Sequence, residues 1–140
     1  MKTAVVYWSG TGNTQAMAEA LVEAIKANGA QVDLFTCDQF SADQVASYDA
    51  FALGCPSMGD EVLEDSEFEP MYDAVEPVLS AKRVALFGSY GWGDGQWMRD
   101  WEARAIGAGL TLIDTLIVNE TPDDEGLQQI AALGKKIVEA

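Results

Sequence analysis

Five short apolar stretches recur along the chain, and their spacing restricts the possible folds more than any other feature of the sequence. They span residues 4–8, 31–36, 50–54, 84–88 and 110–118. Each is short enough for a β-strand, and the segments between them carry apolar residues at helical spacing. Apolar runs without polar alternation are typical of strands that are covered on both faces. The sequence therefore predicts an α/β fold with a three-layer, doubly wound, five-stranded parallel sheet.

The length and the cysteines predict one domain in a reducing compartment. A chain of 140 residues buries about two thirds of its unfolded surface, which favours a single domain over residues 1–140. Cys37 and Cys55 lack the CxxC spacing of metal sites and form no disulfide framework. The sequence also lacks a signal-peptide apolar region and the ~20 apolar residues of a membrane span. We therefore expect a cytoplasmic protein without a metal site.

Acidic residues outnumber basic residues by 23 to 8, and histidine is absent. The net charge of −15 repels nucleic acids and anionic lipid surfaces, so neither is an expected partner. The charge either keeps the chain soluble or steers it onto basic protein partners, and composition leaves both interpretations open. Without histidine, the chain lacks the commonest general base, the commonest metal ligand and any Ser-His or Cys-His nucleophile pair.

Three loops follow the first, third and fourth predicted strands, at residues 9–14, 56–66 and 89–95. Ligands of doubly wound proteins bind outside the carboxyl ends of the strands, where the strand order reverses. We therefore expect the functional site to be built from these three loops.

The first loop, "SGTGNT" at residues 9–14, leads directly from a predicted strand into a predicted helix. Its backbone N–H groups and the helix dipole favour an anion. It lacks the lysine of a Walker A loop, and Gln15 replaces the third glycine of GxGxxG. The hydroxyls of Ser9, Thr11 and Thr14 and the Asn13 amide could bind a phosphomonoester without a cation. The alternative is an ordinary strand-to-helix turn with Thr14 as the helix N-cap.

Two side chains in the other loops suit a planar ligand. Trp92 lies among glycines in "SYGWGDG" and is predicted to be a stacking surface, the alternative being a core residue. Met58 carries a polarizable thioether, which could lie against a ring or simply fill space in the loop. Trp97 and Trp101 are four positions apart on a predicted helix, so we expect both to be buried and outside the site.

Three stretches of the chain carry a resemblance to a known family. They are "SGTGNT", "GCPSMGDEVLEDSEFEP" at residues 54–70 and "ALFGSYGWGDGQWMRDW" at residues 85–101. The resemblance covers essentially the whole chain and is closest to short-chain flavodoxins of anaerobic bacteria, because residues 110–118 show no insertion. It implies the strand order 2-1-3-4-5, non-covalently bound FMN and one-electron transfer between redox proteins.

The resemblance also implies which residues surround FMN. Trp92 and Met58 would cover the two ring faces, and Glu61 would accept a hydrogen bond from the pyrimidine N–H. The Gly59 carbonyl would turn toward the ring on one-electron reduction, although Gly59 could also be a simple turn glycine. The complete implied set is Ser9, Gly10, Thr11, Gly12, Asn13, Thr14, Ser57, Met58, Gly59, Asp60, Glu61, Ser89, Tyr90, Gly91 and Trp92.

The resulting functional hypothesis is a monomeric, low-potential electron carrier that uses the semiquinone/hydroquinone couple of FMN and is not an enzyme. Only carboxylates and neutral dipoles would lie near the ring, so the surrounding negative charge would oppose the second electron. Redox proteins, both reductases and electron acceptors, would dock on acidic residues around the flavin edge. These residues are Asp60, Glu61, Glu64, Asp65, Glu67 and Asp94.

Three other classes of protein are alternatives to this hypothesis. A receiver domain needs an aspartate at the end of the third strand, where this chain has Gly54-Cys55. An FMN-dependent oxidoreductase acting on a small molecule such as a quinone needs a further substrate pocket, for which the chain has no insertion. A phospholigand-binding module without redox function would leave Trp92 and Met58 unexplained.

Overall fold

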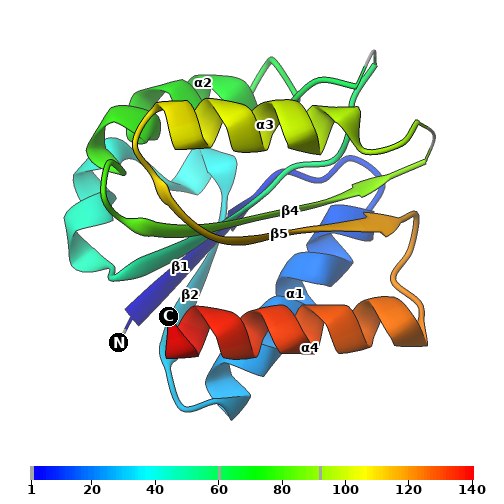
Figure 1. The fold of residues 1–140 in the computed structure, drawn as a ribbon, viewed down its shortest axis with the longest axis horizontal. Helices are drawn as coiled ribbons and strands as arrows, with labels where there is room; N and C mark the ends of the chain where they lie inside the picture. Colours follow the sequence, from blue (N-terminus) through cyan, green and yellow to red (C-terminus); the bar gives the residue numbers. More distant parts are fainter. Residues whose placement is uncertain (1, 60, 92) are drawn as a thin grey trace.

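The computed structural model describes residues 2–59, 61–91 and 93–140, and over these ranges five parallel strands form one sheet. The sheet order is β2-β1-β3-β4-β5, which confirms the predicted topology (Figure 1). The strands are β1 (Lys2–Tyr7), β2 (Gln31–Thr36), β3 (Ala50–Gly54), β4 (Arg83–Tyr90) and β5 (Thr111–Asn119).

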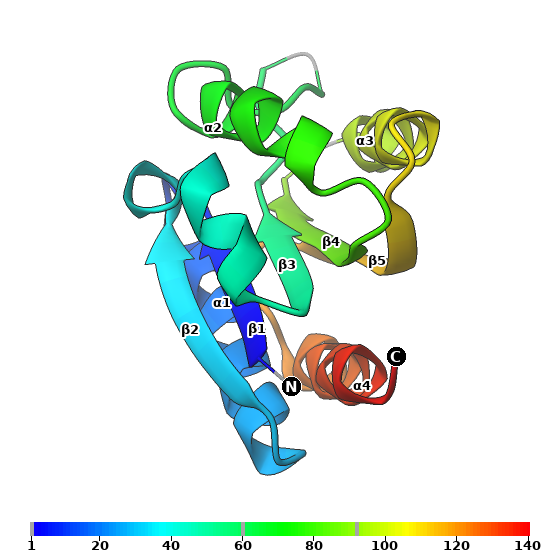
Figure 2. The ribbon, with the colours of Figure 1, turned by 90° about the vertical axis from the view of Figure 1, so that its left-hand side faces the viewer.

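Helices cover both faces of the sheet (Figure 2). One face carries α1 (Asn13–Ala27) and α4 (Asp124–Glu139), and the other carries α2 (Phe68–Val75) and α3 (Gln96–Gly107). Short 3₁₀ segments complete the connections: η1 (Cys37–Gln39), η2 (Ala42–Ser47) and η3 (Glu76–Val78). In the part of the chain that the structure describes, no helix has both the length and the apolar character needed to cross a membrane.

The core forms two apolar layers, one on each side of the sheet. The central strand β3 is buried along its whole length, as expected for a strand covered on both faces. Trp97 and Trp101 are 1% and 2% exposed, which confirms that they belong to the core. The Trp97 indole N–H donates to the Cys55 carbonyl oxygen at 3.2 Å. This contact ties α3 to the end of β3, next to the predicted site.

The boundaries of two predicted loops differ from the observed ones. Asn13 and Thr14 are the first residues of α1, and Ser89 and Tyr90 are the last residues of β4. The N-cap of α1 is Gly12 in the left-handed conformation, with φ of +96°. Thr14 is therefore not the N-cap. Because both pairs belong to regular elements, their side chains are held on rigid parts of the fold.

Candidate cofactor-binding site

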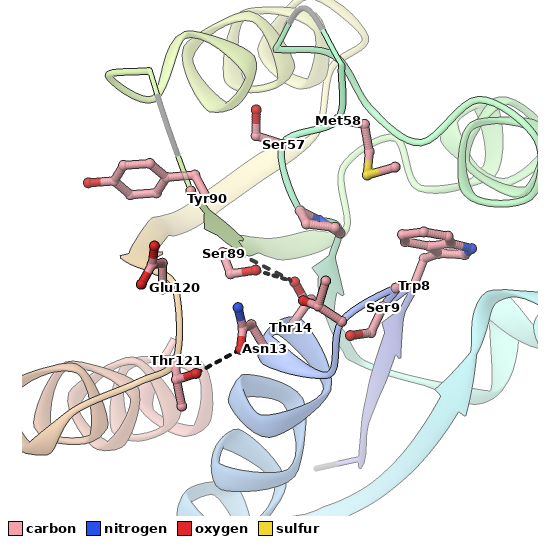
Figure 3. Close-up of a pocket in the computed structure, with 14 residues that line it drawn as sticks. Trp8, Ser9, Asn13, Thr14, Ser57, Met58, Ser89, Tyr90, Glu120 and Thr121 are labelled. Carbon is pink, nitrogen blue, oxygen red and sulfur yellow. Dashed lines mark hydrogen bonds between the residues drawn. The ribbon is translucent and has the colours of Figure 1, made fainter.

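A cavity of about 420 Å³ opens at the carboxyl ends of the strands (Figure 3). It brings ten of the predicted site residues together: Ser9, Gly10, Thr11, Asn13, Thr14, Ser57, Met58, Ser89, Tyr90 and Gly91. Gly12, Gly59 and Glu61 are not part of its lining. Asp60 and Trp92 lie outside the described residues. The remaining lining residues, Trp8, Pro56, Glu120 and Thr121, were not predicted.

The loop after β1 forms the polar end of the cavity. The Ser9 hydroxyl oxygen accepts hydrogen bonds from the backbone N–H groups of Gly12, at 3.1 Å, and Gln15, at 3.2 Å. These bonds fold the loop over the first turn of α1, which carries no acidic residue. Among the described lining residues there is no lysine or arginine. Backbone N–H groups, hydroxyls and the helix dipole therefore supply the attraction for an anion.

Two hydrogen bonds join this loop to distant segments. Thr14 Oγ1 lies 3.0 Å from Ser89 Oγ, and both side chains are buried. Asn13 Oδ1 accepts a hydrogen bond from the Thr121 hydroxyl at 2.9 Å. The start of α1 is thus fixed to the end of β4 and to the segment after β5, as Figure 3 shows.

Aromatic and thioether side chains form the wider part of the cavity. Trp8 and Met58 lie on one side and Tyr90 on the other (Figure 3). Tyr90 packs on Trp97 with 5.8 Å between the ring centroids. Sequence reasoning missed Trp8 because it ends an apolar run and was counted as part of the predicted strand. Its position directly before the "SGTGNT" loop was the signal that could have found it.

Glu120 and Thr121 were not predicted, because the three loops expected to form the site follow the first, third and fourth strands. Both directly follow β5, whose carboxyl end lies beside that of β4. Glu120 has a positive φ of +55°, and its N–H donates to the Tyr90 carbonyl oxygen at 2.8 Å. The same strand-end rule, applied to the fifth strand, would have included these two residues.

A hairpin after β3 carries Met58 and Gly59. The N–H groups of Met58 and Val62 each donate to the other residue's carbonyl oxygen at 2.9 Å. Within this turn, Gly59 has φ of +49° and Glu61 has φ of +56°. A left-handed conformation is rare for a glutamate, so this turn is a strained part of the site.

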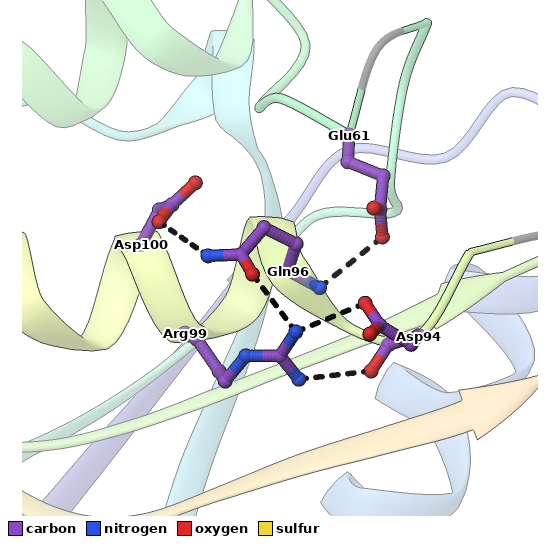
Figure 4. A network of polar contacts seen from close by, with 5 residues as sticks. All are labelled: Glu61, Asp94, Gln96, Arg99 and Asp100. Atoms are coloured by element: carbon purple, nitrogen blue, oxygen red, sulfur yellow. Dashed lines mark hydrogen bonds and ion pairs between the residues drawn. The ribbon is translucent and has the colours of Figure 1, made fainter.

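Glu61 links the hairpin to the start of α3 (Figure 4). Its Oε1 accepts a hydrogen bond from the backbone N–H of Gln96 at 3.1 Å. A Cβ atom on Gly93 would lie 2.5 Å from this oxygen, so only glycine leaves room for the carboxylate. Asp94 pairs with Arg99 at 2.9 Å in the same network. The role of Glu61 toward the pyrimidine N–H stays a prediction.

Glu64 was predicted to belong to the acidic docking surface, and that prediction is wrong. Its side chain is 5% exposed and accepts hydrogen bonds from the backbone N–H groups of Ser66, Glu67 and Phe68 at 2.7 to 2.9 Å. Burial alone would raise the pKa of Glu64, but these bonds and the Ser66 hydroxyl hold it below its usual value. Glu64 therefore closes the turn before α2 and does not meet partners.

The two cysteines are buried free thiols. Burial raises the pKa of Cys37 to about 11, with further contributions from Glu67 and Asp38. Burial also raises the pKa of Cys55 far above its usual value. Both thiols therefore stay protonated near neutral pH and are poor nucleophiles.

The fold and the cavity together define a doubly wound protein whose cavity joins the N-terminus of α1 to an apolar wall. The family model "Flavodoxin" matches residues 5–134. The chain therefore belongs to the flavodoxin family, as its three motifs indicated.

Individual relatives agree with this assignment. The chain is 47% identical over 133 residues to a flavodoxin of Clostridium beijerinckii, covering 95% of this chain and 96% of that protein. It is 52% identical over 120 residues to a flavodoxin of Megasphaera elsdenii, covering 86% and 88%. The solution structure of two-electron reduced M. elsdenii flavodoxin superimposes with a TM-score of 0.92, at 48% identity and 99% coverage of both chains.

Membership in this family settles the class of function. The chain is a flavin-dependent electron carrier that exchanges electrons with redox partners, and not an enzyme acting on a small molecule such as a quinone. The described residues fit a flavin, because the cavity combines an anion-binding helix terminus with an apolar wall of Trp8, Met58 and Tyr90.

Proposed function

We propose that this chain is a low-potential one-electron carrier that binds FMN non-covalently and works between the semiquinone and hydroquinone states. The observation that carries the proposal is the loop of residues 9–14 at the start of α1, which opens into an apolar cavity. A phosphomonoester at this loop would meet N–H groups and hydroxyls without a cation in the described lining. That chemistry suits a mononucleotide with a terminal phosphate.

We assign the cavity residues to the parts of FMN as follows. The phosphate would be held by the backbone of residues 9–14, with Thr14 and Ser89 fixing the loop. The ring would lie between Met58 and Trp92, of which the second lies outside the described residues, and Trp8 would add to the wall. Bound FMN supplies the one-electron chemistry.

Negative charge near the ring supports a low potential for the second electron. Glu120 lines the cavity, and Glu61 lies in the hairpin that begins at the lining residue Met58. Like charges repel more strongly where water is excluded, so a second negative charge on the ring would be disfavoured.

We propose that partners dock by electrostatic attraction on the acidic surface at this edge of the molecule, formed by Glu61, Asp65, Glu67 and Asp94 without Glu64. Asp60, which the sequence also assigned to this surface, lies outside the described residues. The distribution of basic residues supports this proposal. Six of the eight lie at the opposite edge, where the strands begin and where α1 and α4 end (Figure 1). They are Lys2, Lys26, Lys82, Arg83, Lys135 and Lys136. Lys2, Lys135 and Lys136 pair with Asp33, Glu139 and Asp114, so these lysines add only part of a separation of charge that would orient an approaching basic protein toward the cavity.

Three further proposals concern the domain organisation, the oligomeric state and the location of the protein in the cell. The chain acts as one FMN-binding domain, which the single five-stranded sheet supports. It works as a monomer. It resides in the cytoplasm, where the two buried thiols would stay reduced.

Flavin titrations test the proposal. FMN should bind the flavin-free protein far more tightly than riboflavin does, because charge-assisted hydrogen bonds are worth roughly 1.5 to 3 kcal/mol each. Fluorescence quenching measures both affinities, and equal values would refute the phosphate site. A spectroelectrochemical titration should then show two well-separated one-electron steps, the second at low potential. A single two-electron step would overturn the carrier hypothesis.

A further inference from the structure

The Trp8 indole separates the cofactor cavity from a second, smaller cavity. The second cavity has a volume of about 220 Å³ and shares Trp8 and Ser9 with the first. It is otherwise lined by Tyr7, Gln15, Thr36, Cys37, Asp38 and Glu67. Trp8 is only partly buried, so packing alone does not fix its ring. Rotation of the indole into the second cavity would remove part of the cofactor cavity wall.

Two contacts hold the indole in place. At the five-membered ring, the Nε1–H group donates to Glu67 Oε1 at 3.2 Å, across 59 positions of sequence. At the six-membered ring, a Cβ atom on Gly10 would lie 3.0 Å from Cη2, so the ring lies directly against the glycine backbone. The first contact sets the direction of the ring, and the second lets it approach the loop of residues 9–14.

Glu67 is itself held by the turn before α2. Its backbone N–H donates to Glu64 Oε1 at 2.7 Å, and Glu64 is buried. Glu67 is the N-cap residue of α2, so its backbone position is fixed by the helix start. The exposed Glu67 carboxylate is thereby held next to the Trp8 indole in the cavity wall. A hydrogen bond to a carboxylate is stronger than one between neutral groups.

We propose that Glu67 is a positioning residue that keeps the Trp8 indole across the ring end of the cofactor cavity. This role is additional to docking, because Glu67 also belongs to the acidic surface proposed above. The expected effect of Glu67 on the affinity for flavins rests on the proposed function. The hydrogen bond itself is a property of the flavin-free protein.

Three variants test the inference. Glu67→Ala removes the acceptor, Glu67→Gln removes the charge but keeps an acceptor oxygen, and Glu23→Ala removes an exposed carboxylate on α1 as a control. In the flavin-free protein, the Trp8 indole N–H resonance, assigned with Trp8→Phe, should shift in Glu67→Ala and stay near its original position in Glu67→Gln. Glu23→Ala should leave the resonance unchanged.

Affinity supplies the second readout. Glu67→Ala should weaken FMN and riboflavin binding by the same factor, about fivefold to tenfold, because the lost hydrogen bond acts at the ring end and not at the phosphate. Glu67→Gln should restore most of this loss. The inference is overturned if Glu67→Ala leaves the indole resonance and both affinities unchanged, or if Glu67→Gln behaves like Glu67→Ala. Absence of flavin binding in the unmodified protein would refute the proposed function, whereas the resonance would still test the Glu67–Trp8 contact.

Discussion

Thr14 and Ser89 lie 75 positions apart in the sequence, yet their hydroxyl oxygens are 3.0 Å apart and buried. The Ser89 N–H also faces Thr14 Oγ1 at 3.4 Å. One hydroxyl therefore connects the first turn of α1 to the end of β4. The loop of residues 9–14 depends on this link for its position, because the loop itself consists of small polar residues.

Removing the Thr14 hydroxyl should destabilise the fold. Thr14→Val keeps the shape of the side chain but leaves the buried Ser89 hydroxyl unpaired, at a cost of about 1 to 3 kcal/mol in the free energy of unfolding. Adding Ser89→Ala should recover part of this loss, because the unpaired group is then absent. Urea denaturation measures each value, with Thr111→Val on the exposed start of β5 as a control. Strict additivity of the two substitutions would contradict the link.

The Glu64 carboxylate should make stability depend on pH. Its pKa is lowered in the folded state, so its stabilisation is complete above the unfolded-state pKa and is lost as the pH falls through the lower folded-state pKa. Glu64→Ala should cost about 1 to 3 kcal/mol at pH 7. The gap between the two proteins should narrow in acid. Thermal or urea unfolding from pH 7 to pH 3 measures the free energy of unfolding of both proteins. A difference between them that stays constant over this range would show that Glu64 does not accept its hydrogen bonds as an ionised carboxylate.

A side chain on Gly93 should displace Glu61. A Cβ atom there would lie 2.5 Å from Glu61 Oε1, and the φ of +85° is unfavourable for alanine. We expect Gly93→Ala to lower the free energy of unfolding by about 1 to 2 kcal/mol and to weaken flavin binding. Gly29→Ala is the matched control, because Gly29 has a φ of +87° and a Cβ atom there would meet nothing within 4 Å, so it should show the backbone strain without the loss of flavin binding. Equal behaviour of the two variants would show that the Glu61 contact with α3 is unimportant.

Gly59 tests whether the hairpin changes conformation with the flavin. Its φ is +49°, and a Cβ atom would meet nothing within 4 Å, so Gly59→Thr strains the backbone without a clash. Strain of about 1 to 3 kcal/mol confined to the reduced hairpin would lower the first one-electron potential by roughly 40 to 130 mV. Because this φ is already positive here, the oxidised protein should share part of the strain, and we expect a smaller decrease.

The control for this variant is Gly59→Asn, since asparagine enters the left-handed region more readily than threonine does. Spectroelectrochemistry should show a smaller change in potential for asparagine than for threonine. Unchanged potentials in both variants would mean that Gly59 serves only the turn.

Docking should depend on salt. Electron transfer between this chain and a positively charged redox protein should slow as ionic strength rises, because a Debye length of about 10 Å at 0.1 M screens the approach. Asp65→Asn, at an exposed position of the docking surface, should make the salt dependence shallower, and Glu23→Gln on α1 should not. Stopped-flow kinetics measures the slopes. Rates that stay constant from low to high salt would assign the net charge to solubility alone.

The fold class, the polar loop at the start of α1 and the burial of Trp97 and Trp101 could all be predicted from the amino-acid sequence. These features follow from local patterns, because strand and helix periodicity and the composition of a strand-to-helix loop involve residues close together in the chain. The family also follows from the sequence, since the three motifs that indicate it are continuous stretches of the chain.

The contacts between side chains distant in sequence became visible in the folded structure. Glu64 is buried because its carboxylate accepts hydrogen bonds from the backbone N–H groups of its own turn. The sequence shows only that Glu64 is one of several acidic residues, and does not show the direction of its side chain. Trp8, Glu120 and Thr121 join the cavity because parallel strands bring their carboxyl ends to one edge of the sheet, whatever their distance in sequence. The orientation of Trp8 toward Glu67 and of Glu61 toward α3 arises in the same way, since hydrogen bonds between distant residues require the packed fold.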